Sequence, residues 1–313
     1  MNTVAPLALV TVTYNSQDVL EDFFNSLLTD PRLPKIKLYL IDNASADKTL
    51  EVAARYKDRI DMSVRANAEN LGVAVGNNQG ISAALSDGAE WILLLNNDII
   101  IPEGTLAGLL ETATEQGLHI LTPTIEGTEP VESVWYAGGT ISPYQGMKVR
   151  HEKMGSPIVG APRGLHKTPY ASTCCLLIHR DVINLIGGMD KDYFVYFDDV
   201  DFAIRAKAAG FPYWLTGEYK IIHKASSLTG GYLSPFSVRW ISRNWVLVTR
   251  KHCSTVQKVT ALAYMQVWMM ARVAARRDTI PHYLLRQRSF LEGLKVPLTR
   301  HGATVGLESA PEM

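Results

Sequence analysis

The sequence has few cysteines and no excess of charge, and both features exclude classes of protein. Its 313 residues contain three cysteines, Cys174, Cys175 and Cys253. An odd number in so long a chain excludes a disulfide-stapled scaffold and indicates a reducing compartment. Lysine and arginine total 31, as do aspartate and glutamate, so the net charge is zero. A dedicated nucleic-acid binder would carry a basic excess, so we expect no nucleic-acid partner.

Long apolar segments are also absent. The N-terminal residues include no basic leader, and the chain contains no run of about 18 uncharged apolar residues. The nearest candidate is the segment 259–275, which Gln266 and Arg272 interrupt. We therefore expect a cytoplasmic protein without a membrane span, in which this segment forms a buried or interfacial helix.

The zero net charge hides an uneven distribution. Residues 239–300 contain twelve lysines and arginines but only two acids, Asp278 and Glu292, so this segment carries +10 and the rest of the chain −10. Such a split predicts an acidic body with a basic patch that faces something anionic. The alternatives are a basic helical cap packed on its own domain and a dimer interface.

The first half of the chain alternates between strand-like and helix-like segments. Strands are predicted over 8–13, 36–42, 60–66, 91–95 and 119–123, with helices over 18–28, 47–56, 72–85 and 102–113. This alternation predicts a parallel sheet covered on both faces. A loop-rich region with short strands follows over 125–170. Further on, we expect strands over 171–178 and 213–223, helices over 180–186 and 200–209, and basic helices from Pro235 onward.

Polar residues follow four of the predicted strands, where ligands of open parallel sheets bind. Asn, Asp, Ser and Gly are also common in turns and at helix N-caps, so each position alone is weak evidence for a binding site. Asp98 is the strongest, because a carboxylate directly after a buried strand suits a hard divalent cation such as Mg²⁺. The glycine-containing segment 72–80 leads into a helix whose free N–H groups could face a phosphate. It is neither a dinucleotide fingerprint nor a P-loop.

Three acids in four residues open the predicted helix after residue 197. They are Asp198, Asp199 and Asp201, and aromatic residues precede them. Acids in the first turn of a helix interact favourably with the helix dipole, which is one explanation for them. The other is that crowding raises the pKa of one carboxylate into the range of a general base. Helical spacing puts Asp198 and Asp201 on one face and Asp199 on another, so we expect different roles. His223 closes the last predicted strand and is a candidate for metal or phosphate binding.

Taken in order, these motifs resemble a known family. VTYN (12–15), IDNAS (41–45), NLGVAVGNNQGI (70–81), LLLNND (93–98), GGMDKDYFVYFDDVDFAIRAKAAGF (187–211) and His223 resemble the inverting family-two glycosyltransferases, and within them bacterial rhamnosyltransferase-like enzymes. The resemblance covers about residues 5–250. It implies a GT-A fold, a Rossmann-like α/β mixed sheet with helices on both faces, here followed by a C-terminal helical extension. It also implies a glycosyltransferase domain over 1–235, with a nucleotide-binding half (1–125) and an acceptor half (126–235), and a basic helical extension over 236–313.

The resemblance also implies roles for individual residues. Asp98 would bind Mg²⁺ or Mn²⁺ with His223, because Asn96-Asn97-Asp98 stands where the family has its DxD motif. Asp199 would be the general base, with Asp198 and Asp201 supporting the acceptor. The nucleotide-sugar donor would contact Thr13, Tyr14, Asn15, Asp42, Asn70, Gly72, Asn78, Asn97 and Asp98, with Asp42 on the pyrimidine. The sequence departs from the family at Asn96, and at Thr173, where relatives often have glycine and where a branched side chain would narrow the pocket.

The expected reaction is an inverting, metal-dependent transfer of a sugar to a lipid-linked or surface-polysaccharide glycan. The best match is L-rhamnose from dTDP-rhamnose, and a polyprenyl-diphosphate-linked acceptor would bring the enzyme to the cytoplasmic face of the inner membrane. The basic arginines Arg272, Arg276, Arg277, Arg286 and Arg288 suit anionic headgroups there. The alternatives are a UDP-hexose donor, a non-catalytic glycan-binding or nucleotide-sugar-binding module, and a nucleotidyltransferase. A nucleotidyltransferase would need a basic glycine-rich loop, and residues 13–20 contain no glycine, lysine or arginine. The sequence leaves the oligomeric state open.

Overall fold

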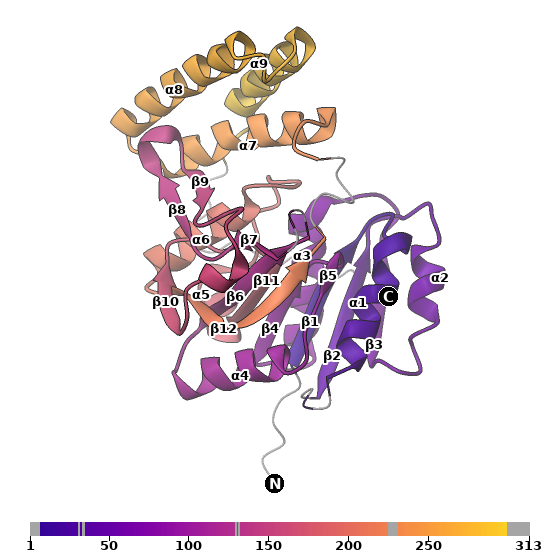
Figure 1. Cartoon of the computed structure of the whole chain (residues 1–313). Helices are drawn as coiled ribbons and strands as arrows, with labels where there is room; N and C mark the ends of the chain where they lie inside the picture. The colour runs from indigo at the N-terminus through magenta and orange to yellow at the C-terminus, as the bar shows by residue number, and fades with distance from the viewer. Residues whose placement is uncertain are drawn as a thin grey trace.

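A mixed β-sheet lies at the centre of the molecule, with helices on both of its faces and a layer of three helices at one end (Figure 1). The computed structural model describes residues 7–30, 32, 35–128, 130, 132–224 and 231–298. The last part of the predicted extension, 299–313, lies outside these residues. The predicted α/β architecture, a mixed sheet with helices on both faces and a C-terminal helical extension, is confirmed.

The strands lie between residues 7 and 223. They are β1 (Leu7–Thr13), β2 (Ile36–Asp42), β3 (Met62–Ala66), β4 (Trp91–Leu95), β5 (Ile99–Ile100), β6 (Ile120–Gly127), β7 (Ser133–Tyr136), β8 (Gly139–Ser142), β9 (Lys148–His151), β10 (Leu165–Thr168), β11 (Cys175–His179) and β12 (Tyr213–His223). The main sheet has the order β10-β12-β6-β11-β4-β1-β2-β3, with β5 paired to β12 and β7 to β6. β8 and β9 form a separate hairpin.

The predicted parallel arrangement holds for β3, β2, β1 and β4. β4 has the sequence WILLL, an unbroken apolar run, because both of its faces are covered. β11 then runs antiparallel between β4 and β6, which makes the sheet mixed. The parallel strands therefore end at one edge, where their polar C-terminal turns meet.

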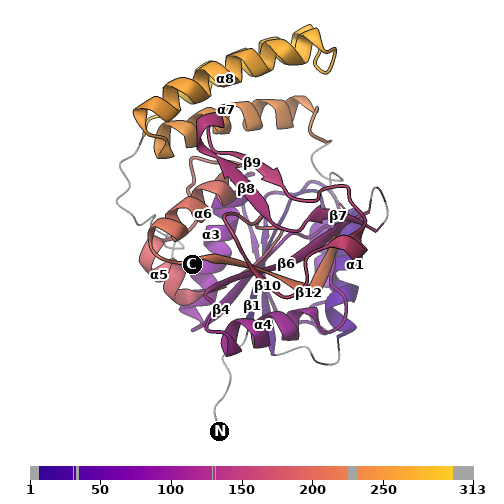
Figure 2. The same cartoon turned by 60° about the vertical axis from the view of Figure 1, so that its left-hand side comes forward.

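The helices cover the sheet or form the terminal layer. They are α1 (Gln17–Leu28), α2 (Thr49–Ala54), α3 (Gly72–Ser86), α4 (Thr105–Glu115), α5 (Arg180–Ile186), α6 (Asp198–Ala208), α7 (Pro235–His252), α8 (Thr255–Ala274) and α9 (Ile280–Lys295). Figure 2 shows α3, α5 and α6 on one side of the sheet and α1 and α4 on the other. α3 packs closely on β1, since a Cβ on Gly76 or Gly80 would lie 2.8 Å or 2.4 Å from a valine side chain of that strand.

Two features of the fold differ from the sequence-based expectation. The strand expected over 171–178 begins only at Cys175, because residues 171–174 form a turn, and Cys174 accepts a hydrogen bond from the backbone N–H of Asn96 at 3.0 Å. The two-residue strand β5 was not predicted, since two apolar residues carry no periodic signal. Cys174, Cys175 and Cys253 are buried free thiols, in agreement with a reduced core.

α7, the first helix of the extension, is hydrogen-bonded to the part of the chain that contains the sheet. Asn244 donates to the backbone carbonyls of Val195 and Tyr196, and the Trp245 ring N–H donates to the carbonyl of Gln145. α8 and α9 then pack on α7 and on each other. In the part of the chain that the structure describes, no helix has the length and hydropathy to cross a bilayer.

Candidate active site

A cavity of about 580 Å³ opens at the edge where the parallel strands end. Its walls come from the turns after β1, β3 and β4, the segment before β11, and the segment that leads into α6. The predicted site residues that line it are Thr13, Tyr14, Asn70, Gly72, Asn97, Asp98, Asp198, Asp199 and His223. Residues from both predicted halves of the domain therefore face a single space.

Asp98 and His223 lie side by side on the floor of this cavity because β5 pairs with the end of β12. His223 is the register partner of Ile99, the residue after Asp98. Both side chains are buried, and Nε2 of His223 lies 3.2 Å from Oδ1 of Asp98. This contact does not count as a hydrogen bond, so Oδ1 of Asp98 has no hydrogen-bond partner among the described residues. The same is true of Nδ1 of His223 and Oδ1 of Asn97.

This donor set fits a hard divalent cation. A buried carboxylate oxygen without a partner is costly unless a cation or donor completes it, and imidazole nitrogen and amide oxygen are suitable additional ligands. Asn96 supplies no carboxylate, and its amide lies 3.5 Å from His223. The site therefore offers one carboxylate to a metal, as its sequence indicates.

A second group of metal-type ligands lies elsewhere. The ligand atoms of His119, His179 and Asp181 lie within 4.8 Å of one another. His179 ends β11 opposite Trp91, the first residue of β4, so this group is at the amino edge of the parallel strands. It is therefore separate from the cavity and contributes nothing to the Asp98–His223 pair.

Asp198 and Asp199 enter the cavity from the first turn of α6. The Tyr170 hydroxyl donates to Oδ2 of Asp199 at 2.6 Å, whereas Oδ2 of Asp198 has no partner among the described residues. Burial and the neighbouring charge raise the pKa of Asp198 to about 8. Burial also raises the pKa of Asp199, to about 6, and the hydrogen bond from Tyr170 opposes this rise. Asp199 is thus the carboxylate of the pair that is ionised at neutral pH and able to accept a proton.

The backbone before these acids is strained. Tyr196 and Phe197 have φ values of +66° and +68°, which side chains other than glycine rarely adopt. Asn244 of α7 is buried and holds the carbonyls of Val195 and Tyr196, and the Tyr196 hydroxyl lies 2.9 Å from that of Ser237. The extension therefore fixes the turn that directs the acids into the cavity.

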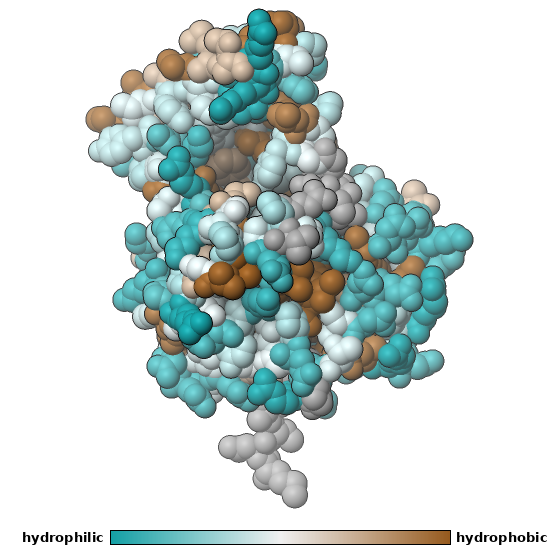
Figure 3. Space-filling view, viewed as in Figure 1, coloured by the Kyte–Doolittle hydropathy of each residue, from teal (hydrophilic) through white to brown (hydrophobic). Residues whose placement is uncertain are grey.

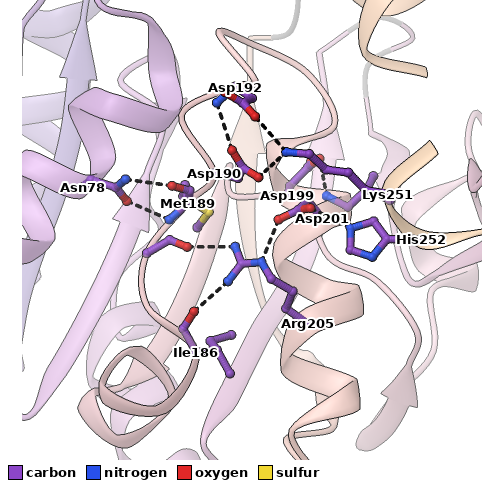
Figure 4. Close-up of polar contacts among 12 residues, drawn as sticks. Asn78, Ile186, Met189, Asp190, Asp192, Asp199, Asp201, Arg205, Lys251 and His252 are labelled. Carbon is purple, nitrogen blue, oxygen red and sulfur yellow. Dashed lines mark hydrogen bonds and ion pairs between the residues drawn. The ribbon is translucent and has the colours of Figure 1, made fainter. Parts of the chain in front are cut away.

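Asp201 faces away from the cavity, which differs from the predicted grouping of the acids. Its carboxylate accepts hydrogen bonds from His252 at 2.6 Å and Arg205 at 2.7 Å (Figure 4). Burial alone would raise the pKa of Asp201, but these partners outweigh it and lower the pKa. Asp198 is thus grouped with Asp199 at the cavity, and Asp201 joins α6 to α7. Asp201 does not line the cavity, so the structure does not bring it into contact with the site as predicted.

The same junction extends to the loop before α6. Lys251 pairs with Asp190 and, at 3.1 Å, with Asp192 (Figure 4). Asn78 of α3 exchanges two hydrogen bonds with the backbone of Met189, so it does not line the cavity as predicted. Both the nitrogen and the oxygen of its amide therefore anchor this loop, and the side chain is buried next to the site rather than in it.

Asp42 and Asn15 also lie outside the cavity lining. Asp42 is 1% exposed and accepts hydrogen bonds from the Thr13 hydroxyl, the Ser45 hydroxyl and the Ser45 N–H. The Asn15 side chain accepts from the N–H of Ala46. Both residues shape the turns that carry Thr13 and Tyr14, and a direct contact of Asp42 with a base stays a prediction.

Two N–H groups at the start of α3, which segment 72–80 was expected to offer to a phosphate, have partners within the protein. The N–H of Gly72 donates to the Asn70 side chain, and that of Val73 donates to the carbonyl of Phe194 at 2.7 Å. Gly72 has φ +83°, and a Cβ there would lie 2.4 Å from the Phe194 carbonyl. Glycine is required for this close approach, so the motif serves packing against the α6 loop.

The aromatic wall of the cavity was largely missed from the sequence. It consists of Trp135, Tyr170, Phe194, Tyr196, Tyr232 and Phe236. Trp135 packs edge-on against the His223 ring at 4.6 Å between centroids. The aromatic residues just before the acids were the available signal, but they include only Phe194 and Tyr196 of this wall, and the sequence does not show which rings converge. Thr173, singled out as a departure from the family, does line the cavity.

Replacement of Asp198 should show the cost of its burial. The pKa of Asp198 rises from 3.8 to about 8 on folding, because the buried carboxyl resists ionisation. The folded state is therefore favoured most below pH ~4, and this stabilisation is lost as the pH rises through about 8. Asp198→Asn cannot ionise, so we expect it to increase the free energy of unfolding at pH 8 by on the order of 2 kcal/mol and by less at pH 5. Urea unfolding at both pH values measures this. Asp181→Asn, an exposed first-turn acid of α5, is the control, and a pH-independent effect of Asp198→Asn would contradict the prediction.

Comparison with known proteins identifies the class of this site. The sequence model described as Glycosyl transferase family 2 matches residues 8–187, more than half of the chain. The chain therefore belongs to the family-2 glycosyltransferases, as its motifs predicted, and is a glycosyltransferase. The alternatives of a nucleotidyltransferase and a non-catalytic module are thereby set aside.

Individual relatives point in the same direction. The N-acetylglucosaminyl-diphospho-decaprenol L-rhamnosyltransferase of Mycobacterium tuberculosis is 28% identical over 246 residues, 72% of this chain and 78% of that enzyme. S. aureus TarS 1–349 is 13% identical with a TM-score of 0.57, over 93% of this chain and 81% of that one. GalNAc-T7, solved with UDP, GalNAc and Mn²⁺, is 14% identical with a TM-score of 0.62, over 95% and 57% of the two chains. At these identities the two structures establish the fold only.

Proposed function

We propose that the protein is an inverting, metal-dependent glycosyltransferase that moves L-rhamnose from dTDP-rhamnose to a lipid-linked or surface-polysaccharide glycan. One observation carries this proposal: the Asp98–His223 pair and the Asp199 carboxylate face the same cavity. Displacing a nucleoside diphosphate requires stabilisation of the leaving charge, and activating an acceptor hydroxyl requires a base. The two groups supply these two functions.

In the proposed reaction, the acceptor hydroxyl oxygen bonds to the anomeric carbon while the bond from that carbon to the diphosphate oxygen breaks. Asp199 takes the hydroxyl proton, and the nucleoside diphosphate leaves with the bonding electron pair. A single displacement inverts the anomeric centre and needs no covalent nucleophile. Tyr170 orients the base through its 2.6 Å hydrogen bond to Oδ2 of Asp199.

Asp98 and His223, with Asn97 beside them, are the residues that would hold Mg²⁺ or Mn²⁺. When bound, the cation neutralises the charge that develops on the leaving diphosphate. The chain's own contribution is to keep these ligands buried and without competing hydrogen bonds. Tyr14, Asn70 and Gly72 would then contact the nucleotide at the same edge of the sheet.

The choice of donor and acceptor rests on two observations. The 28% identical relative is named as an L-rhamnosyltransferase acting on a diphospho-decaprenol lipid. L-Rhamnose carries a methyl group in place of a hydroxymethyl, and the aromatic wall of the cavity offers it an apolar surface. A lipid-linked acceptor would keep the enzyme at the cytoplasmic face of the membrane.

A thermal-shift screen of nucleotide sugars with and without Mn²⁺ tests the proposal. We expect dTDP-rhamnose to raise the Tm in a metal-dependent way. A shift by a UDP-sugar instead would keep the mechanism and replace the donor. If no nucleotide sugar shifts the Tm in the presence of Mn²⁺ and a decaprenyl-type acceptor analogue, the proposed donor site is wrong.

A further inference from the structure

The outer face of α8 is apolar over its whole length. Its exposed side chains recur at helical spacing on one side of the helix and carry no charge: Val256, Val259, Thr260, Ala263, Val267, Met270, Ala271 and Ala274. From first to last they span ~27 Å of helix. The charged residues within α8, Lys258 and Arg272, are only partly exposed and lie on other sides. We call this set the α8 stripe.

The α8 stripe lies at the end of the molecule farthest from the sheet. α8 belongs to the outermost layer of helices, beside α9 in Figure 1 and above α7 in Figure 2, and Figure 3 shows several brown, hydrophobic side chains among pale and teal ones over this part of the molecule. α9 beside it also exposes large apolar residues, Ile280, Leu284, Leu291 and Leu294, and Leu298 follows its end. Monomeric soluble proteins rarely leave so extended an apolar surface in water, so it marks an interaction site.

Not all arginines predicted to meet headgroups are free to do so. Arg272 and Arg286 both donate to the buried carboxylate of Asp278, at 2.8 Å and 2.7 Å, and both lie over the Trp268 ring. Burial would raise the pKa of Asp278, but these hydrogen bonds outweigh it and lower the pKa to about 2. These two arginines therefore hold α8 and α9 together and do not belong to a binding surface.

The remaining basic side chains flank the apolar residues. Arg276 and Arg277 follow the end of α8, and Arg288 and Lys295 lie among the exposed leucines of α9. All four are exposed and form no ion pair among the described residues. The only acids in the described part of 254–298 are Asp278 and Glu292, and both are paired with arginines. The surface is thus apolar and cationic with no free acid.

We propose that the α8 stripe docks on a lipid bilayer that contains anionic headgroups, with α8 parallel to the membrane plane. An apolar helix face flanked by arginine and lysine is the pattern of an interfacial helix. Pairing with a second copy of the chain is disfavoured by charge. In an antiparallel pair of α8 helices, Lys258 of one copy would approach Arg276 and Arg277 of the other. In a parallel pair, these arginines would approach the same arginines of the second copy. In neither case is an unpaired acid nearby to reduce the repulsion.

This inference rests on the proposed function for its purpose, because a bilayer-bound enzyme would find a lipid-linked acceptor in the membrane. Its physical basis is independent of the active site, since no residue of the α8 stripe lines the cavity. The two claims can therefore fail separately, and the experiment keeps them apart.

The test is co-sedimentation of the full chain with vesicles of phosphatidylglycerol and phosphatidylcholine, and with vesicles of phosphatidylcholine alone. We expect binding to the anionic vesicles, weakened by high salt. Val259→Glu with Val267→Glu should reduce the partition coefficient about tenfold or more. Val159→Glu is the control, because Val159 is 89% exposed in a short 3-10 helix (Ile158–Gly160) outside α8 and α9, and this variant should bind as the wild type does.

Circular dichroism and the nucleotide-dependent Tm shift of each variant establish that folding and donor binding are intact. Wild-type protein that binds neither vesicle, or a Val259→Glu/Val267→Glu variant that binds as the wild type does, would overturn the docking surface. A wild-type dimer in light scattering that this variant converts to monomer would overturn it in favour of self-association. Vesicle binding without any nucleotide-sugar shift would instead count against the proposed function alone.

Discussion

Asp199→Asn should abolish sugar transfer while leaving nucleotide binding nearly intact. The amide keeps an oxygen for the Tyr170 hydroxyl but has no basic lone pair for the acceptor proton, so the loss should equal a general-base contribution of about 10²–10⁴-fold in kcat. Asp199 is bonded to Tyr170 and to the N–H of Val200, and neither contact involves the Asp98–His223 pair. The affinity for nucleoside diphosphate, measured by titration calorimetry, should therefore change little.

The pH dependence gives a second measure of the same role. Because the base must be ionised, kcat should rise with pH through the raised pKa of Asp199, about 6. The Tyr170 hydrogen bond opposes this rise in pKa, so Tyr170→Phe should move the acidic limb of the profile to higher pH. Asp181→Asn, a first-turn acid of α5 outside the cavity, should leave both rate and profile unchanged. Retained turnover in Asp199→Asn would remove Asp199 as the base.

The parts of the fold that were predictable are those set by local sequence. The strands and helices from β1 to α4 follow one another with short connections, so hydrophobic periodicity alone locates them. Their alternation predicts a parallel sheet, which brings Thr13, Asn70 and Asp98 to one edge. The mixed half was less accessible. β11 is recognisable as a strand, but nothing in its own sequence says that it runs antiparallel beside β4.

The roles of Asp201 and Asn78 could not be predicted, since each depends on a partner far along the chain. Asp201 meets His252, 51 residues away, and Asn78 meets the backbone of Met189, 111 residues away. Helical spacing gives the face on which a side chain lies, but not what covers that face. Asp201 was therefore grouped with Asp198 by sequence, although α7 covers it in the fold.

The nearness of Asp98 and His223 has a specific structural cause. The two-residue strand β5 pairs with the end of β12 and sets Ile99 opposite His223, and Lys224 donates to the Asp98 carbonyl at 2.8 Å. Family resemblance predicted that both residues serve one site, whereas β5 is too short for any sequence pattern to show it. The pair is therefore fixed by backbone pairing and not by side-chain packing alone.

Asp98→Ala should make nucleoside diphosphate binding largely independent of Mn²⁺. It removes the one carboxylate available at this site, because Asn96 and Asn97 offer only amide groups, so we expect the Mn²⁺-dependent gain in affinity to fall at least about tenfold. Titration calorimetry of dTDP and UDP, with and without Mn²⁺, measures it directly and requires no turnover. His223→Ala should act in the same direction, and the double variant should lose little more than Asp98→Ala because both residues serve one ion.

His119→Ala separates this site from the second group of ligands, His119, His179 and Asp181. That group is at the amino edge of the parallel strands, away from every residue that lines the cavity, so His119→Ala should keep the full Mn²⁺ effect. Unchanged Mn²⁺ dependence in Asp98→Ala, with loss in His119→Ala, would move the metal away from the diphosphate. In that case Asp199 would still accept the acceptor proton, but protein groups would have to neutralise the leaving charge, and none of the described residues that line the cavity is a lysine or an arginine. We expect the first result because the lining that the structure describes has no lysine or arginine to take the place of a cation.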